Sequence, residues 1–204
     1  MLNRTRVLML VCGLAAAWPS LAHAQDFGIV ESAETIDKGN FKIRANPMVL
    51  FGKNQDSQTG IAIAAGYGLT KAFDIEGQVA FYDGATLFGA NAEIWAVKRD
   101  PFDFSIAFGV HGRHGDKTVD ATGVDLTFLP SKHVNEKLDV YGGLDFAFES
   151  VSDKFGGGNY KTIHLVPGFE YRVNPNLDFV GELGVALNDA ARHYVSAGLA
   201  YYFR

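Results

Sequence analysis

Short segments of this chain alternate apolar with polar residues, and each segment ends at a turn before the next begins. In 73–81, Phe, Ile, Gly, Val and Phe occupy one face, whereas Asp, Glu, Gln and Ala occupy the other. A repeat of two residues is the repeat of a β-strand whose two faces meet different surroundings. Each segment is long enough to cross a hydrocarbon layer as a tilted strand, which needs about 9–11 residues. The predicted strands cover 41–51, 59–70, 73–83, 86–98, 102–114, 119–129, 138–149, 160–173, 177–187 and 192–203.

The first 24 residues have the layout of a secretory signal peptide. Arg4 and Arg6 give a basic start, 7–17 is an apolar stretch, and Ala22-His23-Ala24 is a small-x-small cleavage site. The apolar stretch is too short for a helix that spans a membrane. We therefore expect the chain to be exported in a Gram-negative bacterium and cleaved after Ala24.

The rest of the chain is predicted to be one domain. Residues 25–39 show no sustained alternation, and we expect them to form a short periplasmic lead-in to a barrel over 40–204. The only cysteine, Cys12, lies in the signal, so the mature chain forms no disulfide. Removing the signal takes away two arginines and no acid, which moves the net charge from −5 to −7. This acidic balance argues against nucleic acid as a partner.

The sequence after the signal contains no apolar run long enough for a spanning helix, which needs about 18 residues. In hydrocarbon every backbone polar group must be paired within the protein, so strands can span a membrane only as a closed barrel. We predict an all-β fold, a transmembrane antiparallel up-and-down β-barrel of about ten strands, with eight or twelve strands as alternatives.

The predicted connections support this class. If both termini are periplasmic, the turns on the periplasmic side are 71–72, 99–101, 130–137 and 174–176. The opposite side holds 52–58, 83–85, 115–118, 150–159 and 188–191. Short periplasmic turns and longer extracellular loops are typical of outer-membrane barrels. The segment 130–137 is the exception, because it is long for a periplasmic turn.

Aromatic residues fall at both ends of the predicted outward faces. One band, near the periplasmic ends, contains Phe73, Phe102, Phe128, Phe169, Tyr171, Phe179, Tyr201 and Phe203. The other contains Phe51, Phe81, Phe88, Phe108, Phe146 and Phe148. Two aromatic bands separated by aliphatic residues form the girdles of a membrane barrel. The alternative is a soluble β fold that carries these aromatics in its core and turns its carboxylates outward.

The last strand, 193–203, resembles the C-terminal strand of bacterial outer-membrane barrels, which alternates apolar residues and ends in an aromatic. Here Phe203 is penultimate and Arg204 follows it. The resemblance implies a small porin-like barrel in the bacterial outer membrane, with the lipid of that membrane as a partner. It also implies insertion by the barrel-assembly machinery, which would read the strand ending at Phe203. The resemblance indicates a class of protein and no particular activity.

The polar faces carry many charged residues, which we expect to line the lumen. The candidate lining residues are Glu76, Glu93, Asp125, Asp145, Glu170, Glu182, Arg44, Arg113, Arg172, His111 and His164. Charges removed from bulk water must be paired or hydrated. Either acids and arginines pair into networks that fill the lumen, or the acids line a narrow water-filled path that favours cations. Inward glycines leave room for water, for a small ligand or for long side chains from elsewhere in the barrel.

No pattern in the sequence indicates catalysis, and we predict that the protein is not an enzyme. His193 and Ser196 come closest to the His-Ser arrangement of outer-membrane lipid A deacylases, but their spacing puts them on opposite faces of one strand. His111 and His164 lie on different strands, where single histidines are usually members of polar networks. We predict neither a metal site nor a cofactor.

The sequence therefore favours an outer-membrane barrel whose narrow acidic lumen passes or binds small polar or cationic solutes. The second interpretation is a closed structural barrel that acts at the cell surface through 52–58 and 150–159. The identity of the solute and the oligomeric state stay open.

Overall fold

The computed structural model describes residues 27–52, 55–115, 120–152 and 157–203, so the predicted signal peptide and its cleavage site lie outside the described residues. Within these ranges the chain forms ten strands, and no helix there is long and apolar enough to cross a membrane. The strands are β1 (Phe41–Gly52), β2 (Gln55–Thr70), β3 (Phe73–Tyr82), β4 (Ala85–Arg99), β5 (Phe102–Gly115), β6 (Asp120–Asn135), β7 (Leu138–Ser152), β8 (Gly158–Asn174), β9 (Leu177–Ala186) and β10 (His193–Phe203).

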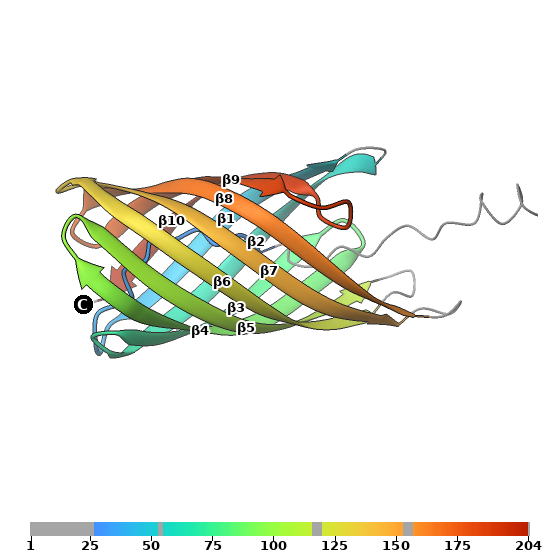
Figure 1. The fold of residues 1–204 in the computed structure, drawn as a ribbon, viewed down its shortest axis with the longest axis horizontal. Coiled ribbons are helices and arrows are strands. Elements are labelled where there is room, and N and C mark those ends of the chain that lie inside the picture. Colours follow the sequence, from blue (N-terminus) through green and yellow to red (C-terminus); the bar gives the residue numbers. More distant parts are fainter. Residues whose placement is uncertain (1–26, 53–54, 116–119, 153–156, 204) are drawn as a thin grey trace, which may run out of the picture.

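The strands form one closed antiparallel barrel (Figure 1). Each strand pairs with its neighbours in sequence, and β1 pairs with β10 to complete the circle. This closing ladder runs from Phe41 opposite Phe203 to Phe51 opposite His193. The predicted fold class and the count of about ten strands are confirmed. The C-terminal strand, β10, closes the barrel by pairing with β1.

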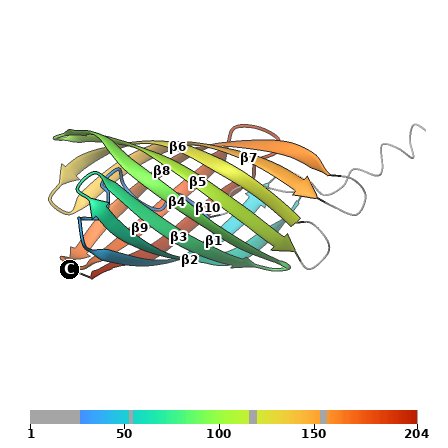
Figure 2. The same cartoon turned by 90° about the horizontal axis from the view of Figure 1, so that it is seen from below.

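The two ends of the barrel differ. The C-terminus and the two-residue turns 71–72, 100–101, 136–137 and 175–176 lie at one end, which we call the turn end, and we call the opposite end the loop end (Figures 1 and 2). The predicted long turn over 130–137 is wrong, because β6 continues to Asn135 and only two residues separate it from β7. Ser131 and Lys132 stay paired with Asp103 and Phe102 of β5, so the ladder passes through a polar stretch that looks like a loop in the sequence.

The alternation in sequence becomes an alternation of environment. Along β1 every second residue is buried, from Lys42 to Leu50, and the residues between them are exposed. Large apolar side chains are exposed on all ten strands, so a continuous apolar surface surrounds the barrel. Contiguous apolar surface of this extent marks a surface that something other than water covers.

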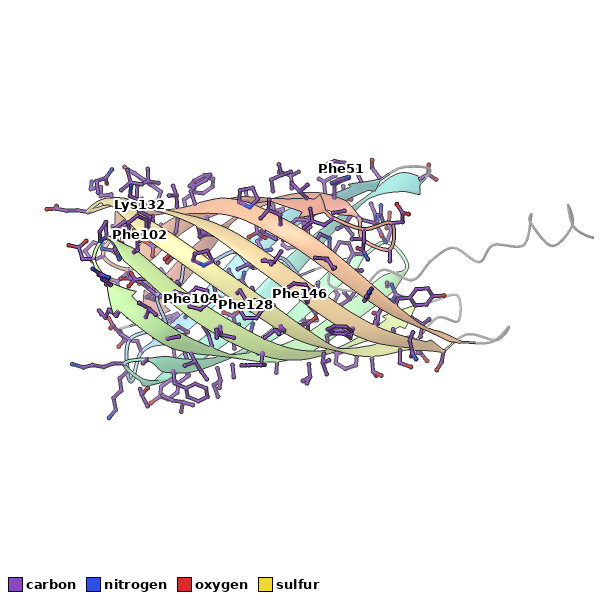
Figure 3. All side chains as sticks on the ribbon, viewed as in Figure 1. Phe51, Phe102, Phe104, Phe128, Lys132 and Phe146 are labelled. Atoms are coloured by element: carbon purple, nitrogen blue, oxygen red, sulfur yellow. The ribbon has the colours of Figure 1, made fainter. Side chains whose placement is uncertain are left out.

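Aromatic side chains lie on the outer wall toward both ends, but Phe128 and Phe146, which the sequence assigns to opposite bands, are neighbours. Phe102 lies near the turn end beneath the ammonium group of Lys132, at 5.4 Å from the ring centroid, whereas Phe51 lies toward the loop end (Figure 3). Between the ends, Phe104, Phe128 and Phe146 form a row across β5, β6 and β7, with ring centroids 6.5 and 6.2 Å apart (Figure 3).

The segment before β1 is the largest departure from the sequence prediction. We expect 25–39 to be a short periplasmic lead-in, but 27–36 lie within the wall with most of their residues buried, and 37–39 are exposed where the segment approaches β1 (Figure 2). Phe27, Val30 and Ala33 are at most 1% exposed. The physical reason is that burying these apolar side chains lowers the free energy of the protein, and that the backbone between them forms hydrogen bonds with the strands. We call residues 27–39 the plug.

Candidate functional site: the lumen and its plug

The plug is a segment without regular secondary structure, so its backbone groups need partners from the wall. Its firmest attachment is to Glu182 of β9. The backbone N–H groups of Ile29 and Val30 donate to Oε1 and Oε2 of Glu182, at 3.0 and 2.7 Å. Tyr141 of β7 donates its hydroxyl to Oε2 at 2.9 Å. One buried carboxylate therefore accepts hydrogen bonds from two successive residues of the plug and from the wall.

The plug backbone is shaped for this contact. Gly28 and Val30 have positive φ angles of 76° and 55°. Such turns direct successive N–H groups toward one anion, in the arrangement known as a nest. A β-branched residue in the left-handed region costs about 1–3 kcal/mol. Because the bonds to Glu182 must offset this cost, removal of the carboxylate should release Val30 from its strained conformation.

Three further wall side chains accept hydrogen bonds from plug N–H groups. Glu170 accepts from Ser32 at 3.0 Å, the hydroxyl of Ser131 accepts from Ala33 at 3.2 Å, and Asp74 accepts from Ile36 at 2.6 Å. With Glu182, three of these four acceptors are carboxylates. Bonds to charged acceptors are about twice as strong as neutral ones. The acidic wall therefore holds the plug mainly through the plug's own backbone.

Buried cations complete the attachment. Arg44 of β1 donates through Nη1 to the carbonyl of Ile29 at 3.0 Å and through Nη2 to Oε1 of Glu76 at 2.5 Å. Lys42 forms ion pairs with Glu76, at 3.0 Å, and with Glu31 of the plug. A buried charge needs partners of this kind, because an unpaired charge inside a protein is costly. The network is the predicted pairing of acids with basic residues, with the plug as an additional member.

Wall glycines provide the space for the plug. A Cβ atom on Gly143 would lie 2.2 Å from Cδ1 of Ile29, and one on Gly66 would lie 2.5 Å from Cδ1 of Ile36. On Gly68 it would lie 2.2 and 2.3 Å from the carbonyl oxygens of Asp37 and Ile36. At these three positions the inward glycines make room for side chains and backbone of the plug.

Apolar side chains of the plug join an apolar layer within the lumen. The buried cluster contains Phe27, Ile29, Ala33, Met48, Leu50, Ala62, Ala80, Tyr82, Leu87, Leu129, Tyr141, Val166 and Tyr194. The lumen therefore contains an apolar layer in addition to the charged residues expected from the sequence. Residues such as Met48 and Leu50 face inward on β1, because the plug supplies apolar partners for them there.

A second polar network lies beside the plug on β5 to β8. His111 bonds Oδ2 of Asp125 through Nδ1 at 2.7 Å, and its Nε2 lies 3.6 Å from Glu149. Asp145 accepts from the hydroxyl of Thr127 at 2.7 Å, and His164 lies 4.0 Å from it. His111 and His164 are thus members of polar networks, as their separate strands suggest.

Most of the predicted lining residues face the lumen. Glu76, Glu93, Asp145, Glu182, Arg44, His111 and His164 are buried, and Asp125, Glu170 and Arg113 are half-buried. Arg172 differs, because it is exposed at the turn end, where β8 extends past the enclosed part of the lumen. The pair His193 and Ser196 is not brought together: His193 accepts from the N–H of Ala186, whereas the Ser196 hydroxyl bonds Asn46 and Pro47.

Two spaces adjoin the plug. A cavity of about 30 Å³, enough for a water molecule or two, is bordered by Glu31, Gln78, Glu93 and Asp125. A larger space of about 260 Å³ lies at the turn end, lined in part by Glu34, Glu170 and Arg172. Burial raises the pKa of the Glu34 carboxyl, and the nearby His133 opposes that shift. The plug thus leaves a cavity of about water size beside Glu31 and a polar vestibule at the turn end.

Sequence reasoning missed the plug and the residues at its turn end. Phe27, Ile29, Val30 and Ile36 are a usable signal, because an exposed lead-in has no use for four large apolar side chains in ten residues. His133 was missed because it lies within 130–137, which the sequence predicts to be a turn.

Known structures share this architecture. An outer-membrane channel from Pseudomonas putida F1 is similar to this chain with a TM-score of 0.57 and 8% sequence identity, over 88% of this chain and 100% of the channel. The outer membrane protein OprG from Pseudomonas aeruginosa gives a TM-score of 0.45 and 12% identity, over 85% of this chain and 100% of OprG. The translocator domain of the autotransporter NalP from Neisseria meningitidis gives 0.46 and 11%, over 98% and 96%.

The first of these similarities identifies the fold as that of a small bacterial outer-membrane barrel, which confirms the resemblance expected from the last strand. No family model matches the chain, and a sequence search of curated proteins finds no match. The function must therefore be argued from the lumen itself.

Proposed function

We propose that this protein is an outer-membrane channel that is closed at rest by its plug and passes small cationic solutes when the plug leaves the lumen. The apolar outer surface, with aromatic side chains toward both ends, supports the membrane location. The observation that carries the gating is the attachment of the plug, which is held inside by hydrogen bonds and ion pairs from wall side chains.

The way the lumen is filled supports the proposal that the plug is a movable gate and not a permanent filling. Side chains from the strands alone fill the interior of a barrel of about eight strands, and ten strands leave somewhat more room. Here the wall has glycines where the plug lies, and the plug joins β1 through Asn40. Withdrawal of the plug would expose Asp74, Glu76 and Glu182, and carboxylates in a pore select cations.

A closed structural barrel is the second candidate. The filled lumen favours it, because the enclosed cavity beside the plug holds little more than water. Such a barrel would act through 52–58 and 150–159, which lie in part outside the described residues. Conductance separates the two candidates, since a permanently filled barrel conducts no ions.

A reversible lock on the plug tests the proposal. The backbone N–H of Ala33 donates to the hydroxyl of Ser131 at 3.2 Å, so A33C/S131C is the double variant chosen to link the plug to the wall through a disulfide. In planar bilayers we expect brief openings of the unmodified protein, loss of these openings when the double variant is oxidised, and their return on reduction. The single variants A33C and S131C are the controls, because they cannot form the crosslink. If neither the unmodified protein nor the reduced variant ever conducts, the channel is excluded in favour of the structural barrel.

Neutralising two buried acids tests cation preference. The double substitution Glu93→Gln with Asp145→Asn removes two carboxylates that face the lumen while keeping side-chain size. We expect the reversal potential in a salt gradient to move toward zero, because fewer carboxylates attract cations. Glu136→Gln is the matched control, since Glu136 is exposed in the turn between β6 and β7. An unchanged reversal potential in the double variant would contradict the assignment of these acids to the conducting path.

A further inference from the structure

Four side chains from four different segments meet at the turn end of the lumen. They are Glu34 of the plug, Asp103 of β5, His133 of β6 and Asp139 of β7. His133 Nε2 lies 2.7 Å from Oδ2 of Asp103 and 3.6 Å from Oε1 of Glu34. Glu34, Asp103 and His133 each offer one atom that could bind a metal ion, and these three atoms lie within 4.8 Å of one another. The strands bring these groups together, because His133 stands opposite Asp139 across the β6–β7 ladder.

The imidazole is held in an orientation that suits a metal ligand. Its Nδ1 lies 2.5 Å from Oδ1 of Asp139, so an N–H at Nδ1 donates to that carboxylate. The other ring nitrogen, Nε2, forms a hydrogen bond with Oδ2 of Asp103 at 2.7 Å and lies 3.6 Å from Glu34, so a metal ion bound there would replace the proton between Nε2 and Oδ2. A histidine that donates one N–H to a carboxylate and offers its other nitrogen is the usual carboxylate–histidine–metal arrangement.

Asp103 is oriented in the same way. Its Oδ1 accepts the backbone N–H of Arg99 at 3.2 Å, which leaves Oδ2 facing His133. The side chain of Asp103 is 2% exposed, whereas His133 and Glu34 are 30% and 36% exposed. The cluster therefore has one fixed ligand within the wall and two partly exposed ligands, of which Glu34 lines the vestibule. Ions from solution have access to it.

The donor set determines which ion fits. One imidazole nitrogen and two carboxylate oxygens are typical ligands of Zn²⁺ and of neighbouring transition metals, and a fourth position would hold water. Ligands at about 2.0–2.2 Å from a tetrahedral ion lie about 3.3–3.5 Å from one another, so the three atoms need to move by about 1 Å or less. Rotation of the partly exposed Glu34 side chain adjusts its own distances to the other two ligands, whereas Nε2 of His133 and Oδ2 of Asp103, now 2.7 Å apart, must separate by about 0.6–0.8 Å.

We propose that Glu34, Asp103 and His133 bind a divalent transition-metal ion, with Zn²⁺ as the representative, and that the bound ion fastens the plug to the wall. Glu34 is the only one of the three ligands that belongs to the plug. An ion that binds only the assembled site stabilises the assembled state by linkage. Metal binding does not depend on the proposed channel activity, whereas the fastening of the plug is meaningful only if the plug can move.

Calorimetric titration of Zn²⁺ into metal-free full chain in detergent tests the site, and Co²⁺ absorption reports the ligands. We expect about one equivalent to bind, with a loss of about 100-fold or more in affinity for His133→Gln and about 10- to 100-fold for Asp139→Asn. His114→Gln is the matched control, because His114 and Asp120 form a similar pair, at 2.8 Å, that is exposed near the loop end. Equal affinities in the His133→Gln and His114→Gln variants would overturn the site.

The fastening is measured separately through a thiol placed on the plug. Ala33→Cys is buried when the plug is docked, so the rate of its reaction with a membrane-impermeant maleimide reports plug exit. We expect Zn²⁺ to slow this reaction about tenfold, and to have no such effect when Glu34→Gln is added. If Zn²⁺ binds but the reaction rate does not change, the metal fastening is wrong even where conductance measurements support the channel.

Discussion

Glu182→Gln is expected to open the barrel. The carboxylate of Glu182 accepts the N–H groups of Ile29 and Val30, and it is the only acceptor described here that bonds two plug residues. A glutamine has one oxygen and one NH₂ group, so one of the two plug N–H groups would face another donor. Bonds to a charged acceptor are worth about 1.5–3 kcal/mol each, and the loss of one with weakening of the other amounts to about 3 kcal/mol. The ratio of undocked to docked plug should then rise about 100-fold.

Two measurements report this change. In bilayers, openings of Glu182→Gln should be more frequent and longer than those of the unmodified protein. In detergent, a thiol at Ala33→Cys should react faster with an impermeant maleimide, and it is the only thiol of the mature chain if the signal carrying Cys12 is removed. Glu170→Gln gives a graded comparison, because Glu170 bonds only Ser32 of the plug. If the openings and the labelling rate of Glu182→Gln equal those of Glu170→Gln or of the unmodified protein, the bonds from Ile29 and Val30 to Glu182 are not the main attachment of the plug.

The sequence predicts the wall of this barrel better than its contents. Strands such as β1 and β3 are predictable because a period of two encodes two environments, and lipid-facing Ile75 and lumen-facing Glu76 need only their neighbours in sequence to be distinguished. The plug is not predictable in this way. Its conformation depends on Glu182, which is more than 150 residues away, and on left-handed φ values at Gly28 and Val30 that no local pattern indicates.

The same limit applies to the cluster at the turn end. Asp103 and Asp139 can be assigned to the inward face from alternation alone. His133 cannot, because Pro130 and the polar residues after it suggest a turn where β6 in fact continues. Glu34 joins the cluster only through the path of the plug. The predictable part of the candidate site is therefore the part on regular strands, and the unpredictable part is where an irregular segment meets them.

Gly68→Ala is expected to displace the plug at its other end. Gly68 of β2 lies against the plug backbone: the N–H of Gly39 donates to its carbonyl at 2.8 Å, and its own N–H donates to the carbonyl of Asn40 at 3.1 Å. An added Cβ would lie 2.2 Å from the carbonyl oxygen of Asp37 and 2.3 Å from that of Ile36. A backbone oxygen cannot rotate away as the end of a side chain can, so the plug must shift.

Overpacking of this kind costs about 1–3 kcal/mol, which corresponds to an increase of about 5- to 100-fold in undocked plug. The hydrogen bond from the Ile36 N–H to Asp74 should be lost first, because Ile36 is one of the residues that must move. Labelling of Ala33→Cys and bilayer openings should both increase. Gly77→Ala is the matched control on the adjoining strand, since a Cβ there has no atom within 4 Å. If both glycine variants label at the rate of the parent, the plug does not depend on its contact with Gly68, and its bonds to Glu182 and to the other wall side chains suffice to hold it in the lumen.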